Sequence, residues 1–312
     1  MRFEKRRNMQ MVKGTPENDQ CQVRWIARSP AVAQHFLYIM IAFMVSAFIA
    51  VPTSLAEPGD DPLGSIMWTE MREQFFGKDP VVFDDRVKVL VPEIVENQAL
   101  VPVTADARAL ADVRKMVVFA DLNPIQHVAT LGVTKAAPFL ALRMKVEQAT
   151  PVRAAALTGD GVWHVGSVFL DAAGGGCSAP AMARQDADWS ETVGHAQGKL
   201  YRELDGMVRA RFRVRHPMDT GLARDNTPSF FIENLDFRTK GGVQLATLEL
   251  REPVSEDPTL TVLVRLPLGD TGLLIDGRDN QGEIYHSVIP ATWRQSAITG
   301  PSNRHRTSTA TP

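Results

Sequence analysis

The sequence predicts an all-β protein, and three observations support this fold class. Of the 312 residues, 44% are hydrophobic and 22% are charged, which is typical of a globular chain rather than of a disordered or fibrous one. Short β-rich runs bounded by Pro, Asn, Asp and Gly follow one another along most of the chain. These runs do not alternate with long helical patterns, as they would in a parallel α/β sheet.

The first 56 residues are expected to be a signal peptide and lie outside the predicted fold. An apolar run over 35–51 follows basic residues and precedes Ser54-Leu55-Ala56, which places small residues where signal peptidase requires them. The alternative is a retained membrane anchor, but the run is shorter than the ~20 apolar residues that a bilayer span needs. Removal of this leader takes with it seven of the 34 basic and three of the 36 acidic residues, which leaves a net charge of −6.

A short helix is expected directly after the leader. Pro62 occupies the first turn, where its missing N–H costs nothing, Asp61 precedes it as a cap, and Gly77 follows the last turn. The apolar residues at helical spacing are Leu63, Ile66, Met67, Met71 and Phe75. We expect this apolar face to pack against the domain that follows.

From Val81 the spacing becomes that of β-strands, in two sets. The first set is 87–91, 101–104, 116–120, 140–145, 152–157 and 162–170. The second set is 208–214, 230–237, 243–250, 259–266, 273–279 and 284–289. Each set spans roughly ninety residues, close to the length of one immunoglobulin-like sandwich, so we predict two such domains. The cysteine pair of antibody domains is absent, so only the architecture is implied.

These patterns divide the chain into five parts. They are the signal peptide at 1–56, a first domain with the helix at 57–171, a Gly-rich Cys arm and linker at 172–206, a second sandwich at 207–290 and a disordered tail at 291–312. Within the linker, residues at helical spacing predict a helix: Trp189, Val193, Ala196, Leu200 and Leu204.

The segment between the two sets points most directly to chemistry. Residues 171–180 have almost no side-chain volume, and three glycines raise the freedom of the backbone: Gly174, Gly175 and Gly176. Cys177 follows them, and it becomes the only thiol once Cys21 leaves with the leader. We therefore predict a solvent-facing Cys177 on a flexible arm that spans at most ~20 Å when extended. Such an arm would bring the sulfur into a cleft of another protein.

An inert Cys177 is the competing interpretation, because a free cysteine is more often a small buried hydrophobe and a Gly-rich run is often a plain linker. No His or Lys lies at a sequence spacing that would lower its pKa, as a nucleophilic enzyme cysteine needs. This favours a carrier, whose partners supply the chemistry, over an enzyme. We predict no catalytic residue.

Other kinds of site have little support in the sequence. A formal net charge of −2 lacks the basic footprint that nucleic acid requires. We therefore expect no nucleic-acid partner, and we also expect neither a metal nor a cofactor. The histidines lack metal-ligand spacing: His127, His164, His195, His216 and His286.

Several short sequence blocks follow one another in a defined order along both halves of the chain. The first half contains Val91-Pro-Glu-Ile-Val-Glu-Asn-Gln98, Val101-Pro-Val-Thr104, Phe119-Ala-Asp-Leu-Asn-Pro124, Arg143 and Gly175-Gly-Cys177. The second half contains His216-Pro-Met-Asp-Thr-Gly221, Phe230-Phe-Ile-Glu-Asn-Leu235, Pro253-Val-Ser-Glu-Asp-Pro258 and Asp276-Gly-Arg-Asp-Asn-Gln-Gly282. In these blocks and their order, the chain resembles sulfur-oxidation carriers of the SoxYZ type, with the Y and Z subunits fused over about 60–290.

The resemblance implies a periplasmic carrier whose arm cysteine, here Cys177, is covalently loaded with a sulfur compound such as thiosulfate. The implied partners are redox enzymes of a periplasmic sulfur-oxidation system, or of a quinoprotein dehydrogenase system, with which fused forms are associated. No membrane partner is expected after signal cleavage. The alternatives are a structural or assembly module of such a dehydrogenase system, with an inert Cys177, and a thiol peroxidase or sulfurtransferase.

The chain departs from the two-subunit carriers in one respect. There the arm ends in Gly-Gly-Cys-Gly-Gly at a free carboxy terminus. Here Ser178-Ala179-Pro180 and a second domain follow Cys177, so the arm is tethered at both ends.

Overall fold

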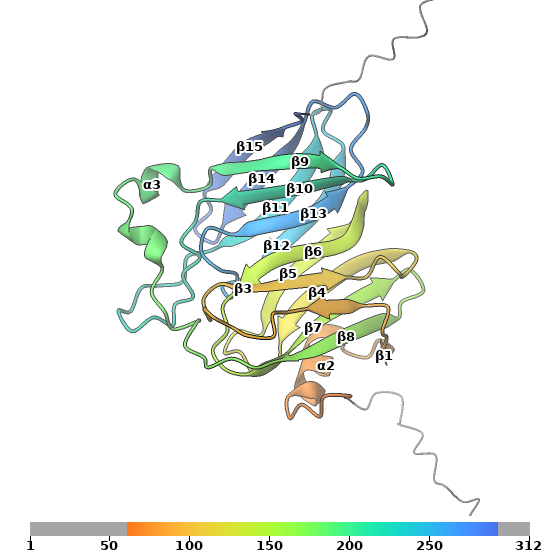
Figure 1. Ribbon diagram of the computed structural model, residues 1–312, viewed down its shortest axis with the longest axis vertical. Coiled ribbons are helices and arrows are strands. Elements are labelled where there is room, and N and C mark those ends of the chain that lie inside the picture. Colours follow the sequence, from red (N-terminus) through yellow and green to blue (C-terminus); the bar gives the residue numbers. More distant parts are fainter. Residues whose placement is uncertain (1–60, 293–312) are drawn as a thin grey trace, which may run out of the picture. The chain divides into compact units, whose positions relative to one another are not determined.

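The computed structural model describes residues 61–292, which form two layers of β-sheet (Figure 1). The predicted signal peptide at 1–56 lies outside these residues, as does nearly all of the tail predicted at 291–312. Across the described range, no helix is both long and apolar enough to cross a membrane.

Strands make up most of both halves, and the all-β prediction is confirmed. The first half comprises α2 (Trp68–Phe76), β1 (Val81–Phe83), β2 (Lys88–Leu90), β3 (Val101–Asp106), β4 (Val113–Ala120), β5 (His127–Val133), β6 (Ala136–Met144), β7 (Thr150–Thr158) and β8 (Trp163–Leu170). The second half comprises η1 (Met182–Gln185), α3 (Trp189–Thr192), β9 (Ala196–Arg202), β10 (Val208–Val214), β11 (Ile232–Thr239), β12 (Gln244–Leu250), β13 (Thr259–Val264), β14 (Gly272–Asp279) and β15 (Ile284–Pro290).

The two halves contribute to the same two sheets. The nine-stranded sheet has the order β1-β8-β7-β4-β5-β12-β11-β14-β15, and the six-stranded sheet has the order β2-β3-β6-β13-β10-β9. Antiparallel pairing joins the halves twice, between β5 and β12 with Leu131 opposite Leu248, and between β6 and β13 with Ala141 opposite Thr261. Each half is thus a two-layer sandwich, and the joined edges leave fewer unpaired strand edges than two separate sandwiches would.

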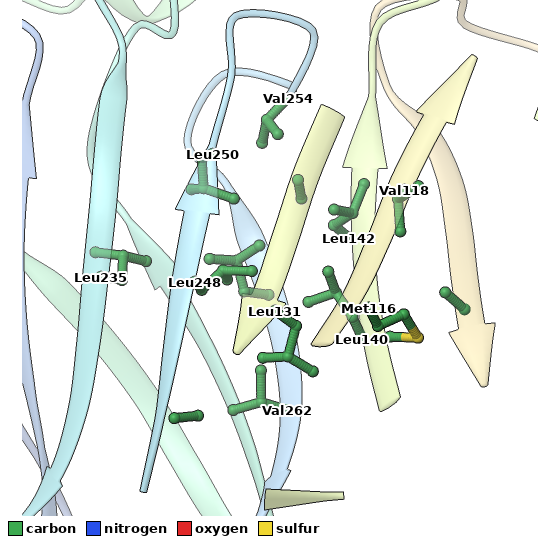
Figure 2. Packing of buried hydrophobic residues seen from close by; sticks show 14 of the residues in the cluster. Met116, Val118, Leu131, Leu140, Leu142, Leu235, Leu248, Leu250, Val254 and Val262 are labelled. Atoms are coloured by element: carbon green, nitrogen blue, oxygen red, sulfur yellow. The ribbon is translucent and has the colours of Figure 1, made fainter. Parts of the chain in front are cut away.

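One hydrophobic core runs through both halves. Strand β10 shows the pattern that builds it, since Val208, Ala210, Phe212 and Val214 are buried while the residues between them are exposed. At the junction, side chains from both halves enter the same cluster. Figure 2 shows Leu131, Leu140 and Met116 of the first half with Leu248 and Val262 of the second.

Helix α2 packs on the outer side of the nine-stranded sheet. Trp68, Met71 and Phe76 form a second cluster there with residues of β4, β7 and β8. The predicted start of this helix at Pro62, with Asp61 as its cap, is wrong, because the helix begins at Trp68. The Asp61 carboxylate instead accepts backbone N–H groups of the preceding turn and binds Arg153 at 2.7 Å. The predicted end is confirmed, since Gly77 follows with a φ of 58°.

The predicted linker helix over 189–204 is wrong. Only Trp189–Thr192 is helical, while Ala196–Arg202 forms β9 and pairs antiparallel with β10. Pairing with β10 buries Leu200 and supplies the backbone with partners, which outweighs the local helical spacing. Gly198 suits this strand, because a Cβ there would lie 2.5 Å from the Arg211 carbonyl oxygen. Part of the segment predicted as linker therefore belongs to a sheet of the second half.

Candidate functional site

Cys177 lies in a segment that packs against the first half and is held by the second. It is 1% exposed, so the prediction of a solvent-facing sulfur is wrong in this conformation. The segment returns from β8 past the end of β6, where backbone hydrogen bonds join it to the loop 145–148. Gly175 donates to the Glu147 carbonyl at 3.2 Å, and Gly176 donates to the Val146 carbonyl at 3.0 Å.

Two side chains hold the backbone around Cys177, and we call them the latch residues, Glu147 and Thr220. The Glu147 carboxylate accepts the N–H of Cys177 at 2.9 Å, and it also accepts the N–H and hydroxyl of Ser178 at 3.1 and 3.0 Å. From the second half, the Thr220 hydroxyl donates to the Cys177 carbonyl at 2.6 Å. Each half therefore contributes one latch residue, and buried peptide groups that would otherwise lack partners are satisfied.

The glycines before Cys177 also have a steric role, which is separate from backbone flexibility. Gly174 and Gly175 have φ of 95° and 85°, in the region that favours glycine. A Cβ on Gly174 would lie 2.2 Å from the Glu147 carbonyl oxygen, and one on Gly176 would lie 2.1 Å from the Gln98 carbonyl oxygen. Close packing of the segment thus needs glycine at these positions. That the three glycines also make the arm flexible stays a prediction.

The thiol of Cys177 is neutral in this conformation. Burial raises its pKa to about 12, the Glu147 carboxylate adds to this effect, and Lys145 opposes it. The Sγ–H is directed to the Lys145 carbonyl oxygen at 3.6 Å. The thiolate is the reactive form of cysteine, so the sulfur is both shielded and unreactive where it lies.

Lys145 places a buried cation close enough to act on the Cys177 sulfur. The residue is 3% exposed, and its ammonium group donates to the Met218 carbonyl. Burial lowers its pKa, while Asp219, Cys177 and Glu256 act in the opposite direction. Neither Lys145 nor the latch residues were identified from the sequence. They lie about 30 to 43 positions from Cys177, and no local spacing links them to it.

Among residues 61–292, no histidine side chain forms a hydrogen bond with another histidine or with the Cys177 thiol. Burial lowers the pKa of His216 to about 3, and its Nδ1 accepts the N–H of Met218 at 3.0 Å, which makes it a neutral buried group. Its Nε2 is buried without a hydrogen-bond partner among the residues described. Within 61–292, no group of three or more His, Cys, Asp or Glu side chains is arranged to hold a metal ion.

Comparisons with known proteins agree with this two-part architecture. Residues 72–177 match the family described as sulfur oxidation protein SoxY, and residues 199–289 match the family described as sulphur oxidation protein SoxZ. The first match ends at Cys177. No curated protein matches the chain.

Two solved structures show limited likeness. The sulfur carrier protein SoxY from Chlorobium limicola f thiosulfatophilum is 23% identical, with 34% of this chain and 94% of that chain covered and a TM-score of 0.31. A β-glycosidase from Bacteroides vulgatus is 8% identical, with 67% and 25% covered and a TM-score of 0.20. Neither TM-score supports a functional conclusion. From the two family matches, the chain joins a SoxY domain and a SoxZ domain of the sulfur-oxidation proteins in one polypeptide.

Proposed function

We propose that this chain is a sulfur carrier that binds a sulfur-compound intermediate covalently through Cys177 and presents it to partner redox enzymes. The observation that supports this most directly is that the SoxY match ends on Cys177, the one free cysteine among residues 61–292. The carrier needs no catalytic residue of its own, because its partners supply the chemistry. We place it in the periplasm, where proteins of the sulfur-oxidation system typically act.

The proposed bond is a disulfide-type bond between Cys177 Sγ and a sulfur anion such as the terminal sulfur of thiosulfate. Sγ first loses its proton to solvent, and the thiolate then joins the thiolate-type sulfur of the cargo. Formation of this S–S bond releases two electrons, which pass to haem groups of a partner enzyme. An oxidising partner must therefore accept these two electrons. Without that partner, we do not expect the chain to bind cargo covalently.

Loading requires that the segment around Cys177 move from the conformation described above. With its pKa raised to about 12 and its surface covered, the thiol meets neither solvent nor a partner. Opening costs the hydrogen bonds to Glu147 and Thr220, whereas the side chains of residues 171–180 are themselves small. Gly174 and Gly175 supply backbone freedom on one side of the sulfur.

Mass spectrometry of the protein purified from its own cells during growth on thiosulfate tests this function. We expect a mass increase on the peptide that contains Cys177, which a reductant removes. Cys177→Ser should abolish it, while the neighbouring substitution Ser178→Ala should retain it. An unmodified Cys177 under these conditions would contradict the carrier function.

A second candidate is favoured by the burial of Cys177. If the thiol is inert, the chain is a structural or assembly module of a periplasmic dehydrogenase system. Its signature would be tight binding to the dehydrogenase by both the native chain and Cys177→Ser, with no adduct on Cys177.

A further inference from the structure

The outer face of the six-stranded sheet carries a row of basic side chains. Strand β10 exposes alternate residues along this face, and they are Arg209, Arg211 and Arg213. On the neighbouring strand β9, the exposed Lys199 is directly opposite Arg211. On β6, Arg143 borders the same hollow as Arg209 and Arg211. We call these five residues the basic sheet face.

The centre of the basic sheet face lacks neutralising partners. Arg209 pairs with Glu203 at 3.0 Å, and Arg213 pairs with Asp257, so the ends of the row are balanced. Among residues 61–292, Lys199 and Arg211 have no acidic side chain within ion-pair distance, and the same holds for Arg143. Like charges directly opposite each other destabilise an antiparallel pair. The Lys199–Arg211 pair is thus expected to destabilise the sheet. Its presence is therefore not explained by a contribution to folding.

The surface around these cations is hollowed and partly aromatic. A hollow of about 530 Å³ is bordered by Arg143, Arg209 and Arg211 together with Phe139, Tyr201 and Thr261. Its lining comes from both halves, since β6 belongs to the first and β9, β10 and β13 to the second. Tyrosine and arginine are among the residue types enriched where proteins bind one another.

The distance between the unpaired cations indicates how large a molecule bound on this face would be. Strands β6, β13, β10 and β9 lie side by side (Figure 1), so Lys199 and Arg143 are three strand spacings apart, roughly 14 Å. The row as a whole is wider than one inorganic oxyanion. A folded protein presents a surface that is wide enough, and an acidic one complements the unpaired cations.

The basic sheet face also lies next to the segment that holds Cys177. Arg143 is on the outward side of β6, and two residues later the Lys145 carbonyl faces the Cys177 sulfur. A protein bound on this face would therefore lie beside the latch rather than on the far side of the molecule.

We propose that the basic sheet face docks the acidic surface of a partner protein across both halves of this chain. The unpaired cations accelerate encounter at low ionic strength and orient the partner toward the end of β6. This docking goes beyond the carriage of sulfur and does not depend on cargo, so Cys177→Ser is expected to dock as the native chain does.

Photo-crosslinking tests the proposal. The purified protein carries benzoyl-phenylalanine in place of Thr261, which lies between Arg211 and Ala141 on the hollowed face. It is irradiated in an extract of its own cells, and the crosslinked peptide is identified by mass spectrometry. We expect a protein adduct on a peptide rich in Asp and Glu, with a yield that falls about tenfold or more in high salt.

Two controls make the result specific. In the first control, benzoyl-phenylalanine replaces Ile284, which borders a hollow lined by Glu233, Asp236 and Asp276. This variant should not capture the same protein. The triple variant Arg143→Glu, Lys199→Glu, Arg211→Glu should lose the crosslink at Thr261. A variant with the same change in charge at the exposed residues Lys78, Arg224 and Lys240 should retain it.

The decisive step is a charge swap. In the captured partner protein, lysines replace the acidic residues of the crosslinked peptide. This altered partner should again crosslink to the triple Glu variant. A nucleic-acid or lipid adduct, the absence of any adduct, or a crosslink that survives in the triple Glu variant would overturn the proposal. The thermal midpoint of each variant must match that of the native protein, which separates loss of docking from loss of folding.

Discussion

The backbone N–H of Cys177 donates to the Glu147 carboxylate, N to Oε2 2.9 Å, across 30 positions of sequence. The same carboxylate helps to raise the pKa of the thiol. Glu147 thus helps to hold the backbone that carries the sulfur and, in addition to burial, helps to keep the thiol protonated. If the chain carries sulfur, control of this contact decides when the sulfur becomes available.

Removal of the Glu147 side chain should expose the thiol. In Glu147→Ala, the Cys177 and Ser178 N–H groups lose their acceptor and the like charge near Sγ disappears, so we expect alkylation of Cys177 at pH 8 to accelerate about tenfold or more. Glu147→Gln keeps an acceptor oxygen and should show a smaller increase. Peptide mapping follows Cys177 separately from Cys21, and Glu73→Gln on α2 is the control. Equal rates in all four proteins would show that Glu147 does not hold the segment.

A methyl group at Gly176 should destabilise the fold. Its Cβ would lie 2.1 Å from the Gln98 carbonyl oxygen and 2.7 Å from that of Val146, and neither backbone atom moves easily. We expect Gly176→Ala to lower the free energy of unfolding by about 1–3 kcal/mol in urea titrations. Gly269→Ala, where nothing lies within 4 Å, should change it by less than about 0.5 kcal/mol. Similar values for the two would mean that the segment is not packed in solution.

Loss of Arg153 should be costly, because its guanidinium is fully buried between two carboxylates. It binds Asp61 at 2.7 Å and Asp121 at 2.8 Å. Arg153→Met leaves both carboxylates without a cation, and we expect a loss of about 3–5 kcal/mol in chemical unfolding. The exposed pair of Arg108 with Asp106 is the control, and Arg108→Met should cost about 0–1 kcal/mol.

Stability should fall as the pH is lowered below about 6.5, because of two histidines that are neutral in the folded chain. Burial lowers the pKa of His216 to about 3 and that of His127 to about 4, whereas an unfolded chain protonates them near 6.5. Their contribution is therefore present above 6.5 and is lost as the pH falls toward the folded values. For His216 the loss between pH 7.5 and 5.0 is about 2 kcal/mol.

Urea titrations at the two pH values measure this slope. His216→Asn should reduce it, since the unfolded chain then has one fewer group to protonate. His286→Asn is the matched control, because His286 is exposed, and it should leave the slope unchanged. A slope that does not change in His216→Asn would show that this histidine is not the source.

Local patterns in the sequence determined much of this protein. Alternation of apolar and polar residues, as in Val208 to Val214, is enough to specify a half-buried strand, and Gly77 marks the end of α2 through its positive φ. The sequence pattern does not predict strand β5, and five residues at helical spacing wrongly predict a helix where β9 lies. Ordered blocks of residues pointed to the fused family, and the position of Cys177 pointed to the candidate site.

Only the tertiary structure decided where those parts meet. Edge pairing of β5 with β12 and of β6 with β13 converts two predicted sandwiches into continuous sheets, and hydrogen bonds between strands distant in sequence leave no periodic trace. Burial of Cys177 likewise depends on Glu147, Lys145 and Thr220, which the fold brings from 30 to 43 positions away. Small residues next to Cys177 are equally compatible with a mobile arm and with a closely packed one. The burial of the Cys177 sulfur is therefore determined by contacts between residues distant in sequence, and not by the local composition.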